Sequence, residues 1–290
     1  MSSRPPVSTA ITFPAFQMML DSDPTLRSGP DSITWRVNGE RVLILGWGRA
    51  VLMQLAHPLV AEGVARHSSF SRSFQAKYGR FQRTLTGMLR LTFGTPYEVW
   101  QTAHSIDLIH AGVHGQLADS AHTHYSARYA DLLKWVHATF VDSMLKTYAL
   151  YIGPLSIAEQ NDYLHKSSII APLLGAPQGY FPESVLELES YLNTTLERGG
   201  LTVSNQTRAM ATYILEGLPI PILGYGIAWS LRLSTAALLP SSLRSAYGLN
   251  WSFLDEIALQ SSAQASRQLH HVLPAALHRW SLATSAKKKL

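Results

Sequence analysis

One stretch decides the fold class: residues 41–64, which read RVLILGWGRAVLMQLAHPLVAEGV. It is apolar over most of its length and far longer than an ordinary strand, so it predicts buried helix. Pro58 lacks the backbone N–H that a helix interior needs, so it divides the stretch into two helices. Gly46 and Gly48 interrupt the first of them without the spacing of a dinucleotide-binding fingerprint, and we interpret them as sites of helix packing or a bend.

Helical periodicity continues outward from this stretch. We expect further helices over 80–93, 96–117, 128–152, 156–174, 183–196 and 251–272. Thr95-Pro96 is typical of a helix start and Gly94 of a helix end, and Ser156-x-x-Glu159 is a capping-box pattern. No run of alternating apolar and polar residues predicts a strand. The expected fold is all-α, with one helical domain over 32–280, an N-terminal extension over 1–31 and a basic tail over 281–290.

Composition excludes several function classes. The 290 residues contain no cysteine, which removes disulfides, cysteine-ligated zinc, iron–sulfur clusters, thiolate haem and cysteine nucleophiles. The net charge is +5, and Lys287, Lys288 and Lys289 account for three of these charges. Because no basic stripe is interleaved with aromatic residues, we expect no nucleic-acid partner. No motif points to an oligomeric state.

Membrane and export signals are weak. The first sixteen residues lack the charged-then-apolar pattern of a signal peptide, which favours a cytoplasmic location. The longest uncharged apolar span runs from Gly217 to Leu231 and contains Pro219 and Pro221. It is shorter than the roughly 18 residues expected of a spanning helix, so we interpret it as a core segment, with a peripheral membrane contact as the alternative.

Histidine is the residue type that stands out, with 12 in the chain. His57, His110, His114 and His137 lie within apolar stretches that we predict to be helical. His110 and His114 would lie one turn apart on one helix face, beside the small residues Ala111, Gly112 and Gly115. Small neighbours let a flat group approach a helix closely, so this pattern suits a non-covalent haem with a histidine axial ligand. The alternative is that each histidine is a core residue satisfied by a hydrogen bond.

Arginine is the second feature. Arg80, Arg83 and Thr84 lie on one face of a predicted helix, and Arg49 lies in an otherwise apolar helix. A buried arginine needs an anion or several acceptors. Haem propionates would provide them, and so would carboxylates of the protein itself.

Taken in order, these blocks resemble the MpaB/rubber-oxygenase family, which includes the latex-clearing proteins. The agreement extends over about residues 32–277 and comprises Gly48-Arg49-Ala50, Gln54-Leu55-Ala56-His57-Pro58, His67-Ser68-x-Phe70, Arg80-x-x-Arg83-Thr84, Thr92-Phe93-Gly94, His110-x-x-Val113-x-Gly115, Tyr125-Ser126-Ala127, Trp135-Val136-His137-Ala138-Thr139, Val141-Asp142-Ser143, Gly153-Pro154-Leu155-Ser156 and a later segment from Leu238 to Trp251.

The resemblance implies a globin-like helical core that holds haem b, uses O2 as co-substrate and cleaves alkene bonds of apolar isoprenoid substrates. It implies that His110 is the axial iron ligand, with His114 as the rival. Arg80, Arg83 and Thr84 would form the distal wall. The rubber oxygenases have lysine where this chain has Arg83, and arginine has no lone pair for iron, so the resting distal site should differ.

Arg49, His57 and His137 complete the predicted cofactor-binding set, although the resemblance assigns no particular contact to the two histidines. An apolar substrate would suit a peripheral membrane contact. Three other functions stay open: a carrier or sensor that binds haem or an apolar ligand without turnover, a haem peroxidase or hydroxylase, and a protein with a structural metal held by histidines.

Overall fold

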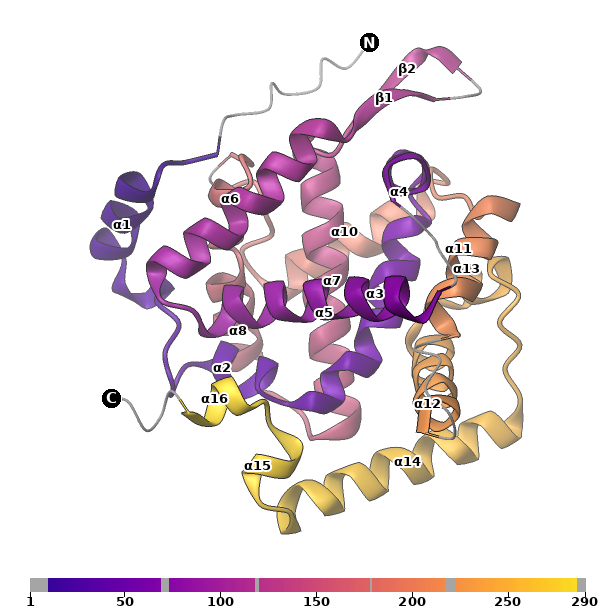
Figure 1. Ribbon diagram of the computed structural model, residues 1–290. Coiled ribbons are helices and arrows are strands. Elements are labelled where there is room, and N and C mark those ends of the chain that lie inside the picture. The colour runs from indigo at the N-terminus through magenta and orange to yellow at the C-terminus, as the bar shows by residue number, and fades with distance from the viewer. Residues whose placement is uncertain (1–9, 69–72, 118–119, 178, 217–222, 286–290) are drawn as a thin grey trace.

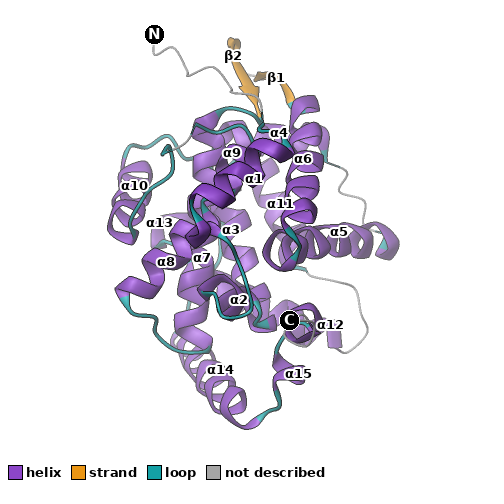
Figure 2. Cartoon of the chain, turned by 90° about the vertical axis from the view of Figure 1, so that its left-hand side faces the viewer, coloured by secondary structure: helices purple, strands orange, loops and turns teal. Residues whose placement is uncertain are grey.

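The computed structural model describes residues 10–68, 73–117, 120–177, 179–216 and 223–285. The predicted all-α class is confirmed, because helices account for nearly all regular structure in these ranges (Figures 1 and 2). A two-stranded antiparallel hairpin is the exception, formed by β1 (His114–Leu117) and β2 (Ser120–Ser126). The lysines of the basic tail and residues 217–222 of the long apolar span lie outside the described residues.

Helix α7 (Ala130–Tyr151) is the centre of the core. Side chains on all of its faces are buried, including the fully enclosed Trp135 and Val141. A helix that is apolar all round is stable only when other elements cover it. Helix α3 (Ile44–Leu55) packs along α7, and both belong to the largest apolar cluster of the described residues.

The two glycines of the deciding stretch are sites of close helix packing. A Cβ atom at Gly46 would lie 2.3 Å from Oγ1 of Thr147 on α7. A Cβ atom at Gly48 would lie 2.1 Å from Oγ1 of Thr235 on α12 (Leu223–Leu238). Real Cβ atoms do not approach other atoms so closely, so only glycine lets α3 lie between these two helices. The helix-packing interpretation is therefore confirmed.

The predicted break at Pro58 is also confirmed. Helix α4 (Pro58–His67) follows α3 at an angle of 106°, and Pro58 occupies its first turn, where no N–H is required. Within the described residues, no single helix is long and apolar enough to cross a membrane. The bent pair 41–55 and 58–67 passes that test by length and composition only.

Helices α5 (Phe74–Phe93) and α6 (Pro96–Gly112) form an open V. They meet at Gly94 and Thr95 and diverge from that turn, as Figure 1 shows. The turn is set by a capping box, in which Thr95 accepts from the N–H of Glu98 and the Glu98 carboxylate accepts from the N–H of Thr95. The N-terminal half of α5 and the C-terminal end of α6 are consequently the separate ends of the V.

The structure corrects one helix boundary that matters for the site. We expected the helix from Pro96 to continue to Leu117, but α6 ends at Gly112 and His114 lies in strand β1. Glycines at 112 and 115 lower helix propensity. Gly115 also pairs with Tyr125, and a Cβ there would lie 2.8 Å from the Tyr125 hydroxyl. His110 and His114 therefore do not share a helix face.

The helix expected over 80–93 begins six residues earlier, at Phe74, and the start of each other predicted helix agrees with the structure within about two residues. Ser156 and Glu159 form the expected capping box and begin α8 (Ile157–Ser167), but the helix does not continue to Leu174, because α9 (Ile170–Leu173) is a separate short helix. Helices α10 (Val185–Glu197) and α14 (Phe253–Val272) match closely. The sequence analysis did not predict the helices α1 (Phe13–Ser22), α2 (Ile33–Asn38), α11 (Asn205–Leu215), α12, α13 (Ser241–Ala246), α15 (Ala275–His278) and α16 (Ser281–Ser285).

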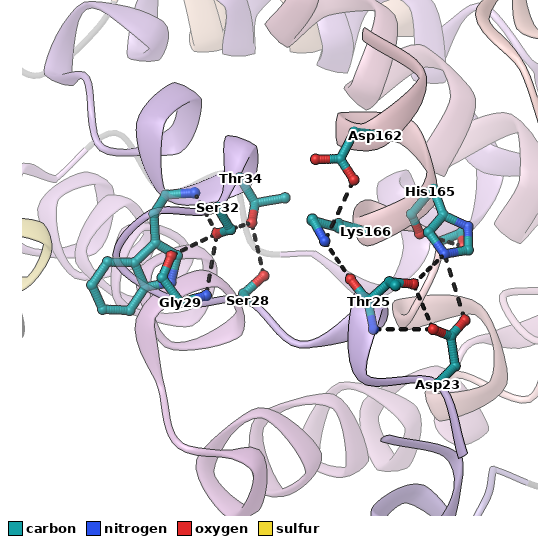
Figure 3. Close-up of polar contacts among 11 residues, drawn as sticks. Asp23, Thr25, Ser28, Gly29, Ser32, Thr34, Asp162, His165 and Lys166 are labelled. Atoms are coloured by element: carbon teal, nitrogen blue, oxygen red, sulfur yellow. Dashed lines mark hydrogen bonds and ion pairs between the residues drawn. The ribbon is translucent and has the colours of Figure 1, made fainter. Parts of the chain in front are cut away.

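The described part of the predicted N-terminal extension packs onto the helical body. Phe16 and Leu20 of α1 are buried against Val99 and Ala103 of α6. Figure 3 shows a polar contact between the turn that follows α1 and helix α8, in which the Lys166 ammonium donates to the carbonyl of Thr25. This packing holds the outer side of α6 in place.

Candidate functional site

His110 lies at the C-terminal end of α6, one of the two open ends of the V. Its Nδ1 atom is buried and has no hydrogen-bond partner among the described residues. Burial lowers the pKa of His110, so the imidazole is neutral near pH 7. A neutral imidazole is the form that ligates iron, and Gly112 beside it faces open space, because a Cβ there would meet no atom within 4 Å.

A partly buried ion pair, between Arg128 and the buried Asp107, lies one turn before His110. The Arg128 guanidinium donates to both carboxylate oxygens of Asp107, with Nε to Oδ1 at 2.9 Å and Nη2 to Oδ2 at 2.6 Å. The Asp107 charge counteracts the lowering of the His110 pKa, whereas the Arg128 charge adds to it. Sequence reasoning missed this pair. Its signal was a lone aspartate on the helix that carries His110.

The ion pair fastens the end of α6 to the segment that leads into α7. Arg128 lies two residues before the start of that helix, and Nη2 of Arg128 also lies 3.4 Å from the carbonyl oxygen of Asp107. A bidentate arginine–carboxylate pair fixes orientation as well as distance. The last turn of α6, which carries His110, is therefore tied to the segment before α7.

Several blocks of the family pattern meet between α4 and the hairpin. A Cβ at Gly63 of α4 would lie 3.3 Å from Val113, so the two segments are in close contact. The Tyr125 hydroxyl of β2 lies 3.2 Å from Nε2 of His67 at the end of α4. These residues hold the hairpin, and with it the end of α6, against α4.

His137 lies on α7 and is buried. Its ring stacks on Phe181, with ring centroids 4.4 Å apart. Burial lowers the pKa of His137 to about 3, and Nε2 has no hydrogen-bond partner among the described residues. His137 is thus a second neutral imidazole with a free nitrogen. His57 is half-buried and caps α4 at the bend that follows α3.

The arginine block lies on α5, the other end of the V. Arg80 is half-buried, and its pKa is lowered mainly by burial, with Arg83 adding to the effect and Tyr213 opposing it. Arg83 and Thr84 are exposed, and the Arg83 guanidinium extends back along the helix toward Gly79. The structure therefore brings Arg80 alone of these three into a protected environment.

Arg49 is held by partners within the protein. Nη2 lies 2.5 Å from Oδ2 of Asp142, Nη1 donates to Oγ of Ser143 at 2.7 Å, and Nε donates to the carbonyl of Leu238 at 2.6 Å. These contacts join α3, α7 and α12. Of the two kinds of acceptor considered above, haem propionates and protein carboxylates, Arg49 pairs with a protein carboxylate, that of Asp142.

The predicted residues are spread over several parts of the fold. His110 is at one end of the V and Arg80, Arg83 and Thr84 are at the other, while His137 and Arg49 are in the core on different helices. His114 is exposed on the hairpin, apart from His110. Of the predicted residues, His110 combines a pKa lowered by burial, a buried nitrogen without a partner among the described residues and open space beside Gly112, and these features suit a residue that holds a cofactor.

Fold and site together define an α-helical protein with His137 buried on the central helix α7, His110 half-buried at the end of α6, and an arginine-bearing helix, α5, as the other arm of the V. The family model described as "ER-bound oxygenase mpaB/B'/Rubber oxygenase, catalytic domain" matches residues 35–268. This match covers most of the chain, so the protein belongs to the mpaB/rubber-oxygenase family, as the sequence blocks indicated. Neither a search of curated proteins nor a search of solved structures gave a match.

Proposed function

We propose that the protein is a haem b-dependent oxygenase that cleaves or oxygenates an alkene bond of an apolar, isoprenoid-like substrate. The membership of an oxygenase family supports the reaction class. The observation that carries the cofactor assignment is the unpartnered Nδ1 of His110 in a ring kept neutral by burial. Buried polar atoms usually have a partner, and an exception calls for a ligand or another explanation.

His110 would hold the cofactor through its imidazole. Bound haem supplies the capacity to activate dioxygen, which the protein side chains lack. The Asp107–Arg128 pair keeps the end of α6 in position, so the ring does not have to be ordered when the cofactor binds. Burial lowers the pKa of His110 and so favours the unprotonated ring, the form that can act as a ligand.

Arg80 is the residue of the distal block best placed to donate hydrogen bonds. Its half-buried guanidinium carries only donors, and a fixed donor in a protected site stabilises negative charge better than it would in water. Arg83 and Thr84 would contribute from the same helix if the substrate covers them. Arg83 cannot occupy an iron coordination position, which separates this protein from rubber oxygenases that have lysine there.

The cofactor assignment is tested by haem binding. The purified protein should show a Soret band and the pyridine haemochrome of haem b, directly or after addition of haemin. His110→Ala should lose most of the band. His104→Ala is the matched control, because His104 lies on the same helix but stacks on Trp100 at 5.1 Å. A full band in His110→Ala would overturn the assignment of His110, and a wild-type chain that takes up no haemin would overturn the haem-dependent function.

A second candidate function is supported by the exposure of Arg83 and Thr84. An exposed distal block suits a carrier or sensor that binds haem or an apolar ligand without turnover. Oxygen uptake with a polyisoprenoid alkene distinguishes the two. The oxygenase should consume O2 only with substrate and haem present, whereas a carrier would show a Soret band and substrate binding without O2 consumption.

A further inference from the structure

Three metal-ligating side chains meet near the C-terminal end of the described chain, away from the residues discussed above. Oε2 of Glu40 lies 2.8 Å from Nδ1 of His278 and 3.5 Å from Nε2 of His270. One ligand atom from each of the three residues lies within 4.8 Å of the other two. The two imidazole rings are 4.5 Å apart between centroids.

The cluster is built by contacts that fix the C-terminal segment on residues 39–41. The N–H of Trp280 donates to the carbonyl of Gly39 at 3.0 Å, and Nε of Arg41 donates to the carbonyl of Arg279 at 2.8 Å. His270 comes from the last turn of α14 and His278 from α15. Both histidines follow residue 268, where the family match ends, whereas Glu40 lies within the matched range.

Glu40 is the buried member of the cluster, with 5% of its side chain exposed. A buried carboxylate requires compensating positive charge or several donors. Arg279 approaches the other carboxylate oxygen, Oε1, with Nε at 3.4 Å, so Oε2 is the oxygen directed to the two histidines. The carboxylate thus offers one oxygen to a guanidinium and the other to the imidazoles.

All three side chains line a cavity of about 420 Å³. Its other walls come from α14, the start of α3 and the end of α7, and include Leu45, Ile152 and Leu269. The volume is large enough for several waters or a small molecule beside the three ligand atoms. A fourth ligand could therefore reach a metal ion from the cavity.

We propose that Glu40, His270 and His278 form a binding site for a divalent transition-metal ion, with Zn²⁺ as its best-fitting representative. Two histidines and a glutamate are an established donor set for zinc with one open position. In a tetrahedral site with bonds of about 2.1 Å the donor atoms lie about 3.4 Å apart. The Glu40–His270 separation already matches this distance, and the Glu40–His278 pair needs to open by about half an ångström. Imidazole donors exclude Mg²⁺ and Ca²⁺ as preferred ions.

The metal would join residue 40 to residues 270 and 278, which closes almost the whole chain into one loop. An ion that binds only the folded state raises the unfolding temperature as its concentration rises. Zinc should therefore stabilise the protein, and a chelator should reverse the effect.

The test is equilibrium dialysis of the full chain against zinc, with zinc and iron counted separately by elemental analysis. Wild type should retain one zinc per chain, and excess Mg²⁺ should not displace it. Glu40→Gln and His278→Ala should each weaken zinc binding by at least about 100-fold, as loss of a ligand exceeds the effect of an outer-shell change. His271→Ala is the matched control, because this exposed neighbour of His270 is not part of the cluster.

The outcomes separate the proposal from ordinary surface binding. Circular dichroism of each variant shows whether it is folded, and Glu40→Gln preserves side-chain shape if His278→Ala is unfolded. Equal loss of zinc in His271→Ala would overturn the proposal, and so would a wild-type chain that retains no zinc. Because iron is counted separately, haem content decides the oxygenase proposal independently of this result.

Discussion

The regions around Arg49 and around His110 differ in whether the protein supplies partners for their buried nitrogen atoms. The Arg49 guanidinium donates hydrogen bonds from Nη1 to Ser143 and from Nε to the carbonyl of Leu238, and its Nη2 forms an ion pair with Asp142. The Nδ1 of His110 and the Nε2 of His137 have no partner among the described residues. All these residues belong to blocks shared with the oxygenase family. Sequence resemblance alone therefore placed structural residues and candidate ligands in one set.

Physical chemistry separates the two kinds of residue. A buried charge whose partners come from the protein itself is accounted for by the fold, and no ligand is needed to explain it. A buried nitrogen without a partner loses its hydrogen bonds to water and gains nothing in return, unless a ligand provides the missing contact. Arg49 is accordingly explained as a connection among α3, α7 and α12. His110 and His137 still need an explanation that the protein atoms do not supply.

Replacement of Arg49 tests the region in which the protein supplies the partners, and it should have the largest effect on the free energy of unfolding. Arg49→Met leaves Asp142 buried without its main partner, which costs about 3–5 kcal/mol in unfolding free energy. Lys146 lies 3.0 Å from Oδ1 of Asp142 and keeps the loss near the lower end. Urea denaturation of the haem-free protein measures the change.

The double variant Arg49→Met with Asp142→Leu is the control. It removes both charges, so it should recover at least half of the stability lost in the single variant. If the double variant were as unstable as the sum of the two single variants, the pair would not be coupled and the contrast with His110 would fail.

His137→Leu tests a buried nitrogen that has no partner among the described residues. It should have an intermediate effect on the free energy of unfolding, and this effect should depend on pH. The folded pKa of His137 is about 3, against 6.5 for an ordinary histidine. Between these values the unfolded chain binds a proton that the folded chain excludes, so stability falls as the pH is lowered through this range. At pH 5 the loss is about 2 kcal/mol.

The leucine variant should lack this dependence. At pH 7.5 its stability should lie within about 1 kcal/mol of wild type, because removing an unsatisfied nitrogen offsets the lost stacking on Phe181. Urea denaturation at both pH values gives the difference. A variant that loses stability in acid as steeply as wild type would show that His137 is not the buried neutral base described above.

The sequence was sufficient to predict the helical class, because apolar stretches, proline breaks and capping residues act locally. Pro58 and the Ser156–Glu159 box illustrate this. The hairpin at 114–126 was missed, since its register depends on Tyr125 meeting Gly115 across the turn. Short helices such as α11 and α13 were also missed, because their formation depends on packing against distant segments.

The candidate site was predictable only in part. The sequence indicated His110 through its motif, but the Asp107–Arg128 pair joins residues 21 positions apart and requires the fold. The partner of Arg49 could be foreseen as a carboxylate but not as Asp142. The Glu40–His270–His278 cluster could not be predicted from the sequence, because Glu40 lies 230 or more positions before both histidines and no spacing pattern connects them.

His114→Ala should have the smallest effect on stability, and it tests the contrast with a histidine that is exposed. The side chain of His114 is exposed on β1, so its removal should change the unfolding free energy by less than about 0.5 kcal/mol. If the buried Nδ1 of His110, which has no partner among the described residues, marks the haem ligand, the Soret band of His114→Ala should equal that of wild type, while His110→Ala loses it. A loss confined to His114→Ala would mean that motif position outweighs burial, and the criterion drawn from the Arg49 and His110 regions would be wrong.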